Sequence, residues 1–272
     1  MSEYDVAVVG GGAAGLSAAL VLARARRRVV VIDAGAPRNA PAAHMQGFLS
    51  RDGMPPADLV ATGRREVAGY GGHLLDGSVD AVRPSDRGGF EVSLSGGRAL
   101  SARRVLVTTG LRDELPDLPG IRERWGRDLL HCPYCHGYEV RDQPVGVLGG
   151  TPEAVQHALL VRQWSGDVVF FTHTDTLTAT EREQLMAREV GIVDGPVARL
   201  AVEDDRILGV ELEDGRVVAR SAVFVRPRFV PHHDLLAALG SETDEAGWPV
   251  VDATGRTSVP GVWAAGLSLI HI

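Results

Sequence analysis

Lysine is absent from this sequence of 272 residues: all 28 of its basic residues are arginine. Catalysis through a lysine Schiff base is therefore excluded. Acidic residues outnumber the arginines, 35 against 28, which leaves a net charge of −7. Surfaces that bind nucleic acid are normally basic, so we expect no nucleic-acid partner. The hydrophobic content of 44% is that of a globular protein with a substantial core.

The sequence also lacks a long apolar run flanked by positive charge. Residues 6–23 carry no charge, but glycines interrupt them and Glu3 and Asp5 precede them. A membrane-spanning helix needs about 20 mostly apolar residues, and a signal peptide begins with basic residues. We therefore predict no membrane segment and a cytoplasmic protein.

Cysteine is nearly absent: the only two are Cys132 and Cys135, within 131-HCPYCHGYEV-140. In a reducing compartment a close cysteine pair is more often catalytic or metal-binding than structural. A disulfide across so short a loop would also add little stability through chain entropy. A zinc site would use these two thiols with His131 and His136, but structural zinc sites usually take ligands from two separated segments.

A redox centre fits this segment best. In a Cys-x-x-Cys pair one thiolate attacks a substrate disulfide and the other resolves the mixed disulfide. Pro133 stiffens the loop between the cysteines. His136 can act as acid and base for the leaving thiol, with His131 and Glu139 as weaker candidates. The alternative is that His136 only packs the turn. The predicted catalytic residues are Cys132, Cys135 and His136, and no metal is predicted.

The N-terminus has the pattern of a dinucleotide-binding βαβ unit. An apolar strand, Asp5–Val9, leads into a glycine turn and a helix, and a second strand, Val29–Ile32, ends in Asp33. The glycines of a G-x-G-x-x-G turn allow a tight bend, close approach to a pyrophosphate and close helix packing. The helix N-terminus then faces the phosphates, and the acid takes a ribose hydroxyl. The candidate cofactor-binding residues here are Gly10, Gly12, Ala13, Ala14, Gly15 and Asp33.

The same unit occurs again 139 residues later without a gap. Such a repeat predicts two related domains. Gly149 and Gly150 fall in the turn and are further candidate nucleotide-binding residues. Three positions that matter for nucleotide binding differ from the first unit: Thr151 replaces the second glycine of the motif, Glu153 adds negative charge near the helix start, and Thr172 replaces the acid. The second site is therefore expected to bind a nucleotide less well.

The rest of the chain alternates between helical and strand patterns. Residues 55–69 predict a helix, and residues 77–110 predict a β-rich insertion that ends in the buried strand Val105–Thr109. The proline-rich residues 115–120 form the best domain boundary. Further predicted elements are the strands Arg206–Glu213 and Arg216–Val225, a break over residues 226–234 and a returning strand within residues 259–266.

The predicted fold is therefore α/β, with two doubly wound Rossmann-like three-layer domains, the second inserted into the first. The first domain comprises residues 1–114 and 248–272. The inserted domain comprises residues 115–247 and carries the cysteine pair.

These motifs in this order resemble the low-molecular-weight thioredoxin reductases and their relatives among the pyridine nucleotide-disulfide oxidoreductases. The matching parts are VVGGGAAGLSAA with Asp33, 107-VTTG-110, the Cys-x-x-Cys pair, the second βαβ unit and 257-TSVPGVWAAG-266. The resemblance implies FAD on the first domain, also lined by Gly110 and Gly266, and NADPH or NADH on the inserted domain.

The resemblance further implies that Cys135 faces the flavin and that Cys132 exchanges with the substrate. The implied substrate is the disulfide or dithiol of a thioredoxin-like protein or of a small molecule, and the implied assembly is a homodimer. The form CPYCHGYE is closer to the gliotoxin-type dithiol oxidases, which pass electrons to oxygen. An oxygen-dependent dithiol oxidase that does not use NADPH is therefore an alternative function. A non-catalytic redox sensor that binds flavin or nucleotide is a second alternative.

Three departures from the reductase pattern accompany this resemblance. First, 172-THT-174 stands where the reductases have H-R-R, whose arginines hold a 2′-phosphate. Second, His136 replaces an aspartate. Third, Leu267 replaces an aspartate that contacts the flavin, and the chain ends in 267-LSLIHI-272, which we interpret as a truncation that weakens FAD binding.

Overall fold

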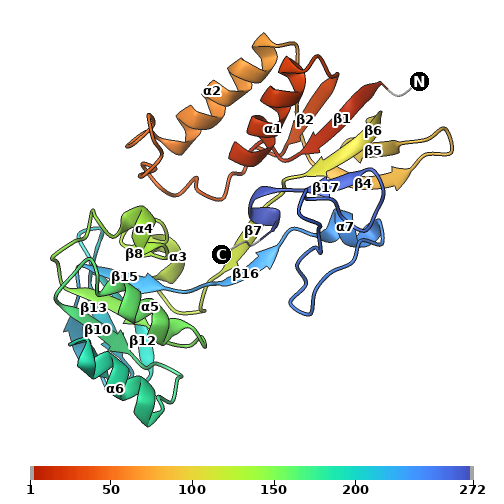
Figure 1. Ribbon diagram of the computed structural model, residues 1–272. Coiled ribbons are helices and arrows are strands. Elements are labelled where there is room, and N and C mark those ends of the chain that lie inside the picture. Colours follow the sequence, from red (N-terminus) through yellow and green to blue (C-terminus); the bar gives the residue numbers. More distant parts are fainter. Residues whose placement is uncertain (1–2, 270–272) are drawn as a thin grey trace. The chain divides into compact units, whose positions relative to one another are not determined.

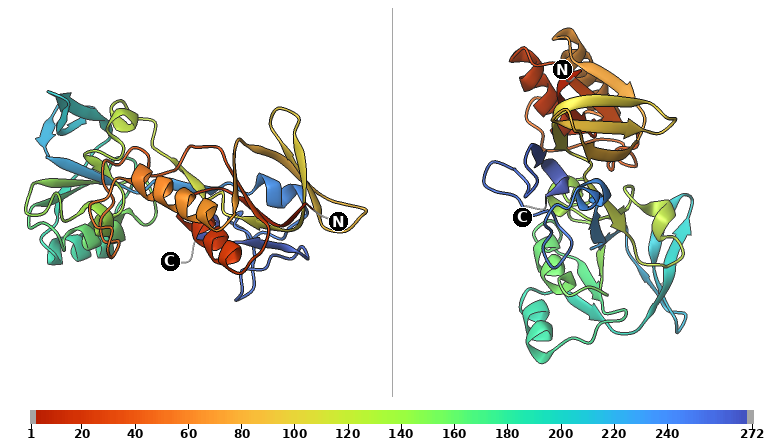
Figure 2. Two further views of the ribbon diagram at one scale, coloured as in Figure 1. Left: turned by 90° about the horizontal axis from the view of Figure 1, so that it is seen from above. Right: turned by 90° about the vertical axis from the view of Figure 1, so that its right-hand side faces the viewer.

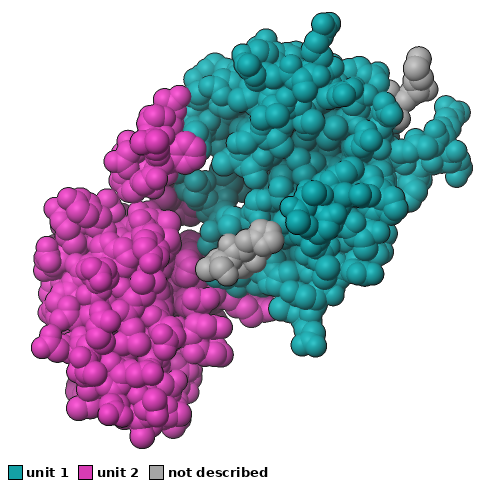
Figure 3. Space-filling view, viewed as in Figure 1, with its two compact units in different colours: residues 1–40, 55–112, 229–272 teal, residues 41–54, 113–228 magenta. Residues whose placement is uncertain are grey.

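The computed structural model describes residues 3–269 (Figure 1). Of the hexapeptide interpreted as a truncated end, residues 270–272 lie outside this range. The chain forms two compact units (Figure 3). Unit 1 contains residues 1–40, 55–112 and 229–272, and unit 2 contains residues 41–54 and 113–228.

Unit 1 is built on a seven-stranded sheet in the order β3-β2-β1-β6-β5-β4, with β17 also paired to β6. Strands β3, β2, β1, β6 and β17 are parallel, whereas β4 and β5 join the sheet antiparallel. Valine and isoleucine dominate β1 and β2, which are almost fully buried, as parallel strands covered on both faces must be. The strands are β1 (Tyr4–Val9), β2 (Val29–Asp33), β3 (His73–Asp76), β4 (Val79–Pro84), β5 (Phe90–Leu94), β6 (Ala99–Val107) and β17 (Val262–Ala264).

Two helices lie side by side on one face of the unit 1 sheet (Figures 1 and 2). Leu16 and Ala19 of the first helix pack there against Val8 and Val31. The opposite face of the sheet has its own core, which includes Leu236 of a short third helix. The sheet therefore separates two apolar layers. The helices of this unit are α1 (Ala13–Arg24), α2 (Pro56–Gly69) and α7 (Asp234–Ala238), with the 3-10 turn η1 (Gly266–Ser268).

Unit 2 repeats this plan with a five-stranded parallel sheet in the order β11-β10-β9-β15-β8. Helices α5 and α6 pack on one face of this sheet, and the antiparallel sheet β12-β13-β14 packs on the other. The strands are β8 (Leu129–Leu130), β9 (Val145–Leu148), β10 (Val168–Phe171), β11 (Gly191–Val193), β12 (Val197–Glu203), β13 (Arg206–Leu212), β14 (Val217–Ala219) and β15 (Ala222–Val225). The helices are α3 (Ile121–Arg124), α4 (Pro133–His136), α5 (Ala154–Val161) and α6 (Ala179–Ala187).

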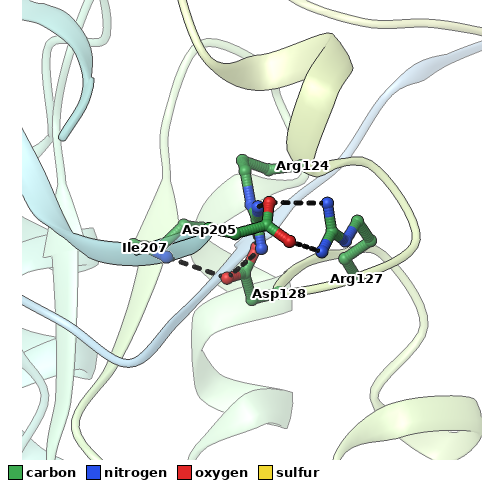
Figure 4. Close-up of polar contacts among 5 residues, drawn as sticks. All are labelled: Arg124, Arg127, Asp128, Asp205 and Ile207. Carbon is green, nitrogen blue, oxygen red and sulfur yellow. Dashed lines mark hydrogen bonds and ion pairs between the residues drawn. The ribbon is translucent and has the colours of Figure 1, made fainter. Parts of the chain in front are cut away.

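An ion-pair network around the buried Arg124 precedes β8, the strand that leads to the cysteines (Figure 4). The guanidinium of Arg124, only 3% exposed, donates to both carboxylate oxygens of Asp128 at 2.7 Å and to Asp205 at 2.7 Å. Arg127 also pairs with Asp205. Asp128 accepts in addition from the backbone N–H of Ile207, at 2.8 Å. Asp128 directly precedes β8 and Ile207 lies on β13, so this bond joins the start of β8 to β13. The buried charge of Arg124 is paired with two carboxylates.

The chain leaves unit 1 through β7 (Leu111–Glu114) and returns through β16 (Arg228–Pro231), and these two strands pair with each other. The predicted fold class is confirmed: two doubly wound α/β domains, the second inserted into the first. Among residues 3–269 no helix combines the length and the apolar character needed to cross a membrane.

Several boundaries differ from the sequence prediction. Residues 229–247 were assigned to the inserted domain but belong to unit 1, because the fully buried Leu236 packs into its core. The predicted break over residues 226–234 contains β16. The single strand predicted for Arg216–Val225 is two strands, which pair in different sheets. Residues 41–54 cluster with unit 2.

Candidate functional site: two glycine turns and a dithiol

The first glycine turn begins where β1 ends. The N–H of Gly10 donates to the carbonyl of Ile32 at 2.8 Å, and its φ of +105° is one that residues with a side chain rarely adopt. A Cβ on Gly10 would lie 2.5 Å from the carbonyl oxygen of Thr108. A Cβ on Gly15 would lie 1.9 Å from the carbonyl oxygen of Gly10. Both predicted glycines are therefore required by close backbone packing.

Gly12 has a different role, because a Cβ added there would meet no atom within 4 Å. It is the N-cap residue of α1, so open space lies at the N-terminus of a twelve-residue helix. Ala13 and Ala14 form the first turn of that helix. Asp33 accepts from the N–H of Gly11 at 2.5 Å through one carboxylate oxygen and from the N–H of Gly35 at 2.9 Å through the other. The predicted residues of this turn are thus brought together.

Gly110 and Gly266 also lie near this turn. The N–H of Gly110, at a φ of +70°, donates to the Oγ of Ser268 at 2.9 Å. A Cβ on Gly266 would lie 2.6 Å from the Cβ of Ala14 in the first turn of α1. The C-terminal segment therefore packs against the helix N-terminus only because it has glycine there. Leu267, in the position expected for a flavin-contacting aspartate, is 50% exposed.

The second glycine turn keeps the strand register of the first. The N–H of Gly149 donates to the carbonyl of Phe171 at 2.8 Å, as Gly10 does to Ile32, so the ungapped repeat of 139 residues is confirmed in the strands. The N–H of Gly150 donates to a carboxylate oxygen of Asp175 at 2.7 Å, which repeats the bond from Gly11 to Asp33.

The prediction that the second unit lacks an acid after its second strand is therefore wrong. The chain turns after Thr172, whose carbonyl accepts from the N–H of Asp175 at 2.8 Å, and this turn brings the carboxylate back to Gly150. A search for an acid within four residues of Phe171, the end of β10, would have found Asp175. The negative charge that Glu153 adds near the helix start is paired with Arg226 at 3.6 Å, which the sequence did not predict.

No arginine occurs at residues 172–174, where the resemblance places a guanidinium pair. The Nδ1 of His173 accepts from the N–H of Val197 at 3.0 Å. Burial lowers the pKa of His173 from its ordinary value, so this imidazole is neutral near pH 7. The hydroxyl oxygen of Thr151 is buried without a hydrogen-bond partner. The second turn is thus a less complete anion site than the first.

The cysteine segment follows β8. Cys132 is the N-cap residue of α4, and its carbonyl accepts from the N–H groups of Cys135 and His136, both at 3.1 Å. Cys135 is exposed and Cys132 is partly exposed. A Cβ on Gly137 would lie 2.5 Å from the carbonyl oxygen of Pro133, so this tight turn also depends on glycine. The predicted dithiol is therefore held on one short helical turn with both residues open to solvent.

His136 is half-buried beside this turn. Burial lowers the pKa of His136, and the carboxylate of Glu139 partly opposes that shift. The imidazole is therefore neutral near pH 7 and has a lone pair available for a proton. His131 uses its Nδ1–H to donate to the carbonyl of Val225 at 3.2 Å. In the part of the chain from 3 to 269, no three His, Cys, Asp or Glu side chains converge in a way that could hold a metal ion.

Residues 4–266 match the family model for the pyridine nucleotide-disulphide oxidoreductases. The chain belongs to this family. It is 32% identical over 97% of its length to the thioredoxin reductase sirT of Leptosphaeria maculans, covering 86% of that protein. It is 31% identical over 97% of its length to the thioredoxin reductase aclD of Aspergillus oryzae, covering 88% of it.

Solved structures agree with this membership. HlmI superimposes with a TM-score of 0.95 at 62% identity, over 98% of this chain and 85% of HlmI. The oxidoreductase from Agrobacterium tumefaciens superimposes with a TM-score of 0.91 at 36% identity, over 99% of this chain and 90% of its own. This pyridine nucleotide-disulphide oxidoreductase is therefore thioredoxin reductase-like, and it is an FAD-dependent disulfide oxidoreductase.

The residues of the first turn fit the FAD that this family uses. The space above Gly12 would admit a pyrophosphate, and the backbone N–H groups at the start of α1 supply donors for it. Asp33 stands where an acid takes the ribose hydroxyls, and each of its oxygens keeps a further lone pair beyond its backbone bond. Leu267 stands where the resemblance leads us to expect an aspartate.

Proposed function

We propose that Cys132 and Cys135 form the redox-active dithiol of this oxidoreductase and exchange electrons with FAD held at the first glycine turn. The observation that carries the proposal is the turn at α4, which holds both cysteines next to each other and open to solvent. The residues that would hold FAD are Gly10, Gly12, Ala13, Ala14, Gly15, Asp33, Gly110 and Gly266. When bound, FAD supplies a two-electron acceptor or donor.

The cysteine pair can undergo a reversible two-electron oxidation. Oxidation of the two thiols forms one S–S bond and releases two protons and two electrons; the reverse step takes them up. With a substrate disulfide, one cysteine thiolate attacks and forms a mixed disulfide, and the first substrate thiol leaves. The second cysteine thiolate then attacks this mixed disulfide, forms the disulfide of Cys132 and Cys135 and releases the second substrate thiol. His136 is neutral and adjacent in sequence to Cys135, so it is suited to take up one proton and return it to the leaving thiol.

The second glycine turn bears on the electron partner. Residues 172–174 offer no guanidinium for a 2′-phosphate, and the carboxylate of Asp175 would face that phosphate. Any nicotinamide bound through Gly149 and Gly150 is therefore better matched as NADH than as NADPH, since a carboxylate can accept from a free 2′-hydroxyl. Arg226 is already paired with Glu153.

The same observation favours a second candidate function, an oxygen-dependent dithiol oxidase. In that direction a dithiol substrate becomes a disulfide, and oxygen takes the two electrons and two protons to give hydrogen peroxide. A poor 2′-phosphate site is no disadvantage to an enzyme that needs no NADPH. The substrate would be a small-molecule dithiol or a thioredoxin-like protein. We further propose a cytoplasmic location and a homodimer.

Anaerobic mixing of the flavin-loaded enzyme with NADPH, NADH or a dithiol tests the proposal. We expect loss of the oxidised flavin absorbance with the dithiol and slower loss with NADPH than with NADH. Fast, saturable reduction by NADPH would instead assign an ordinary reductase. If the dithiol reduces the Cys132→Ser variant as fast as the wild type, the cysteines are not the redox centre. A flavin that no donor reduces would indicate a binding protein without turnover.

A further inference from the structure

One buried histidine has no part in the function proposed above. His157 lies on α5 with only 4% of its surface exposed. Its Nε2 donates to the carbonyl of His131 at 2.8 Å, and His131 directly precedes Cys132. The edge of the ring meets the ring of Phe224 on β15, with 6.0 Å between the centroids. The imidazole thus joins a core helix to the backbone from which the dithiol turn starts.

The hydrogen bonds define the tautomer of His157. A carbonyl oxygen only accepts, so Nε2 must carry the hydrogen and Nδ1 must be an acceptor in the neutral ring. That Nδ1 is buried and has no hydrogen-bond partner. A buried acceptor without a partner is destabilising, so an apolar residue would give a more stable helix core. The equivalent residue of the first repeat is Ala18. Such a cost in one repeat alone indicates a functional reason for the Nε2 bond.

The bond from His157 is one of two hydrogen bonds that hold His131, the residue before Cys132; together we call them the His131 clamp. The ladder between β8 and β15 ends at the pair Leu130 and Phe224. Beyond that pair, the side chain of His131 donates to the carbonyl of Val225 at 3.2 Å, and its own carbonyl accepts from His157. His131 is therefore held on one side by β15 and on the other by α5.

The clamp sets the start of α4. Cys132 follows His131 without an intervening residue, and its carbonyl accepts from the N–H groups of Cys135 and His136. A shift of the His131 peptide would therefore move the N-cap residue of this four-residue helix and change the separation of the two sulfurs. A dithiol whose sulfurs are held at a different separation has a different tendency to close.

We propose that His157 is a positioning residue for the redox reaction, which fixes the His131 peptide and thereby sets the dithiol–disulfide equilibrium of Cys132 and Cys135. This inference rests on the proposed function of the cysteine pair. Burial also lowers the pKa of His157 to about 4, so the ring stays neutral and the single donor is retained throughout the neutral pH range.

The test compares three substitutions at this position in the flavin-loaded enzyme. His157→Gln places an amide N–H near the former Nε2; His157→Asn is too short to reach, and His157→Phe has no donor. Each protein is equilibrated anaerobically with glutathione and glutathione disulfide, the thiols are trapped by alkylation, and the disulfide fraction is read by mass. We expect wild-type behaviour within about twofold for His157→Gln and a shift of about tenfold in the equilibrium constant, about 30 mV, for the other two.

Leu185→Ala is the matched control, since Leu185 is fully buried in the apolar cluster to which α5 contributes but lies on α6. It should lower stability without moving the equilibrium. Folded His157→Phe with a wild-type equilibrium constant would overturn the proposal, and so would an equal shift in Leu185→Ala. If His157→Phe does not fold, His157→Asn against His157→Gln decides in the same way. Wild-type cysteines that form no disulfide at any glutathione ratio would instead remove the proposed function itself.

Discussion

The two glycine turns share a strand register but differ in local backbone. In unit 1 the first glycine of the turn, Gly10, has a φ of +105°, whereas in unit 2 the second, Gly150, has a φ of +108°. Helix α1 begins at Ala13, but α5 begins at Ala154, two positions later than the repeat of 139 residues would place it. The two units therefore share the strand register of the repeat, whereas the backbone of their glycine turns differs.

The comparison separates the residues that support a glycine turn from those that leave room for a ligand. Both turns keep a carboxylate on a glycine N–H, through Asp33 and Asp175, so this bond supports the turn itself. What differs is the third position: open space over Gly12 against a buried, unpartnered hydroxyl at Thr151. Unit 2 has in addition the dithiol, which unit 1 lacks. The proposed flavin site therefore lies in unit 1 and the proposed thiol chemistry in unit 2.

The largest effect is expected at the dithiol. Cys132→Ser and Cys135→Ser should each lower steady-state turnover of a dithiol or disulfide substrate by about a thousandfold or more, because neither serine can form the disulfide. Flavin content should not change, since the turn that we propose to hold FAD lies in the other unit. Turnover above about a tenth of wild type in either variant would contradict the assignment.

The next effect concerns flavin retention. Gly12→Val should lower FAD affinity about a hundredfold, since its side chain fills the space for the pyrophosphate while meeting no protein atom. The fold should survive, which circular dichroism would confirm. Thr151→Val, at the equivalent position of unit 2, is the control and should keep the flavin. Equal loss of FAD in both variants would show that the two turns had been assigned wrongly.

A smaller effect is expected from pH. His157 has its pKa lowered from 6.5 to about 4 by burial first, and then by His131 and Arg226. Because the pKa of this histidine is lower in the folded state than in the unfolded state, protonation favours unfolding. The stability that the neutral ring contributes is therefore fully present above pH 6.5 and is lost as the pH falls toward 4. The free energy of unfolding of unit 2 should therefore fall by about 2 kcal/mol between pH 7 and pH 5.

Hydrogen exchange of α5 peptides, corrected for the intrinsic exchange rate, measures this loss. The α1 peptides of unit 1 serve as the internal reference, because Ala18 takes the equivalent position there and does not titrate. The His157→Gln variant should lack this component of the acid sensitivity. An α5 helix equally protected at pH 5 and pH 7 would be incompatible with a buried neutral imidazole.

The smallest effect is expected at Asp175. Asp175→Asn keeps an oxygen to accept from Gly150 but removes the negative charge, so NADPH binding should improve relative to NADH by about threefold to tenfold. Calorimetric titration of the wild type and the variant with both nucleotides measures the ratio. A ratio that does not move would indicate that the carboxylate does not face the 2′ position.

Much of the fold follows from the order of residues. Alternation of apolar strands with glycine turns and helices predicted both βαβ units, and the helix predicted for residues 55–69 is observed as Pro56–Gly69. The boundaries were harder. Residues 229–247 have few local signals, and their assignment depends on Leu236 entering the core of a domain whose other strands lie far away in the chain.

The candidate site divides in the same way. The residues of the first turn and the cysteine pair are recognisable because each motif is contiguous and its spacing reflects local geometry. The bond from the Gly150 N–H to Asp175 was not predicted, because it depends on a turn that doubles the chain back after β10. Arg226 was overlooked as a partner of Glu153 because 73 residues separate the two in the sequence.

The repeat, its register and the glycines of both turns could be predicted from the order of residues, because strand periodicity and backbone conformation depend on a few neighbouring residues. The acid that supports the second turn and the histidine that binds the backbone before the cysteines became visible only in the folded chain. His157 reaches His131 across 26 residues, and the bond exists only because α5 packs beside the end of β8. Contacts of this kind depend on how elements meet in space, which local patterns do not encode.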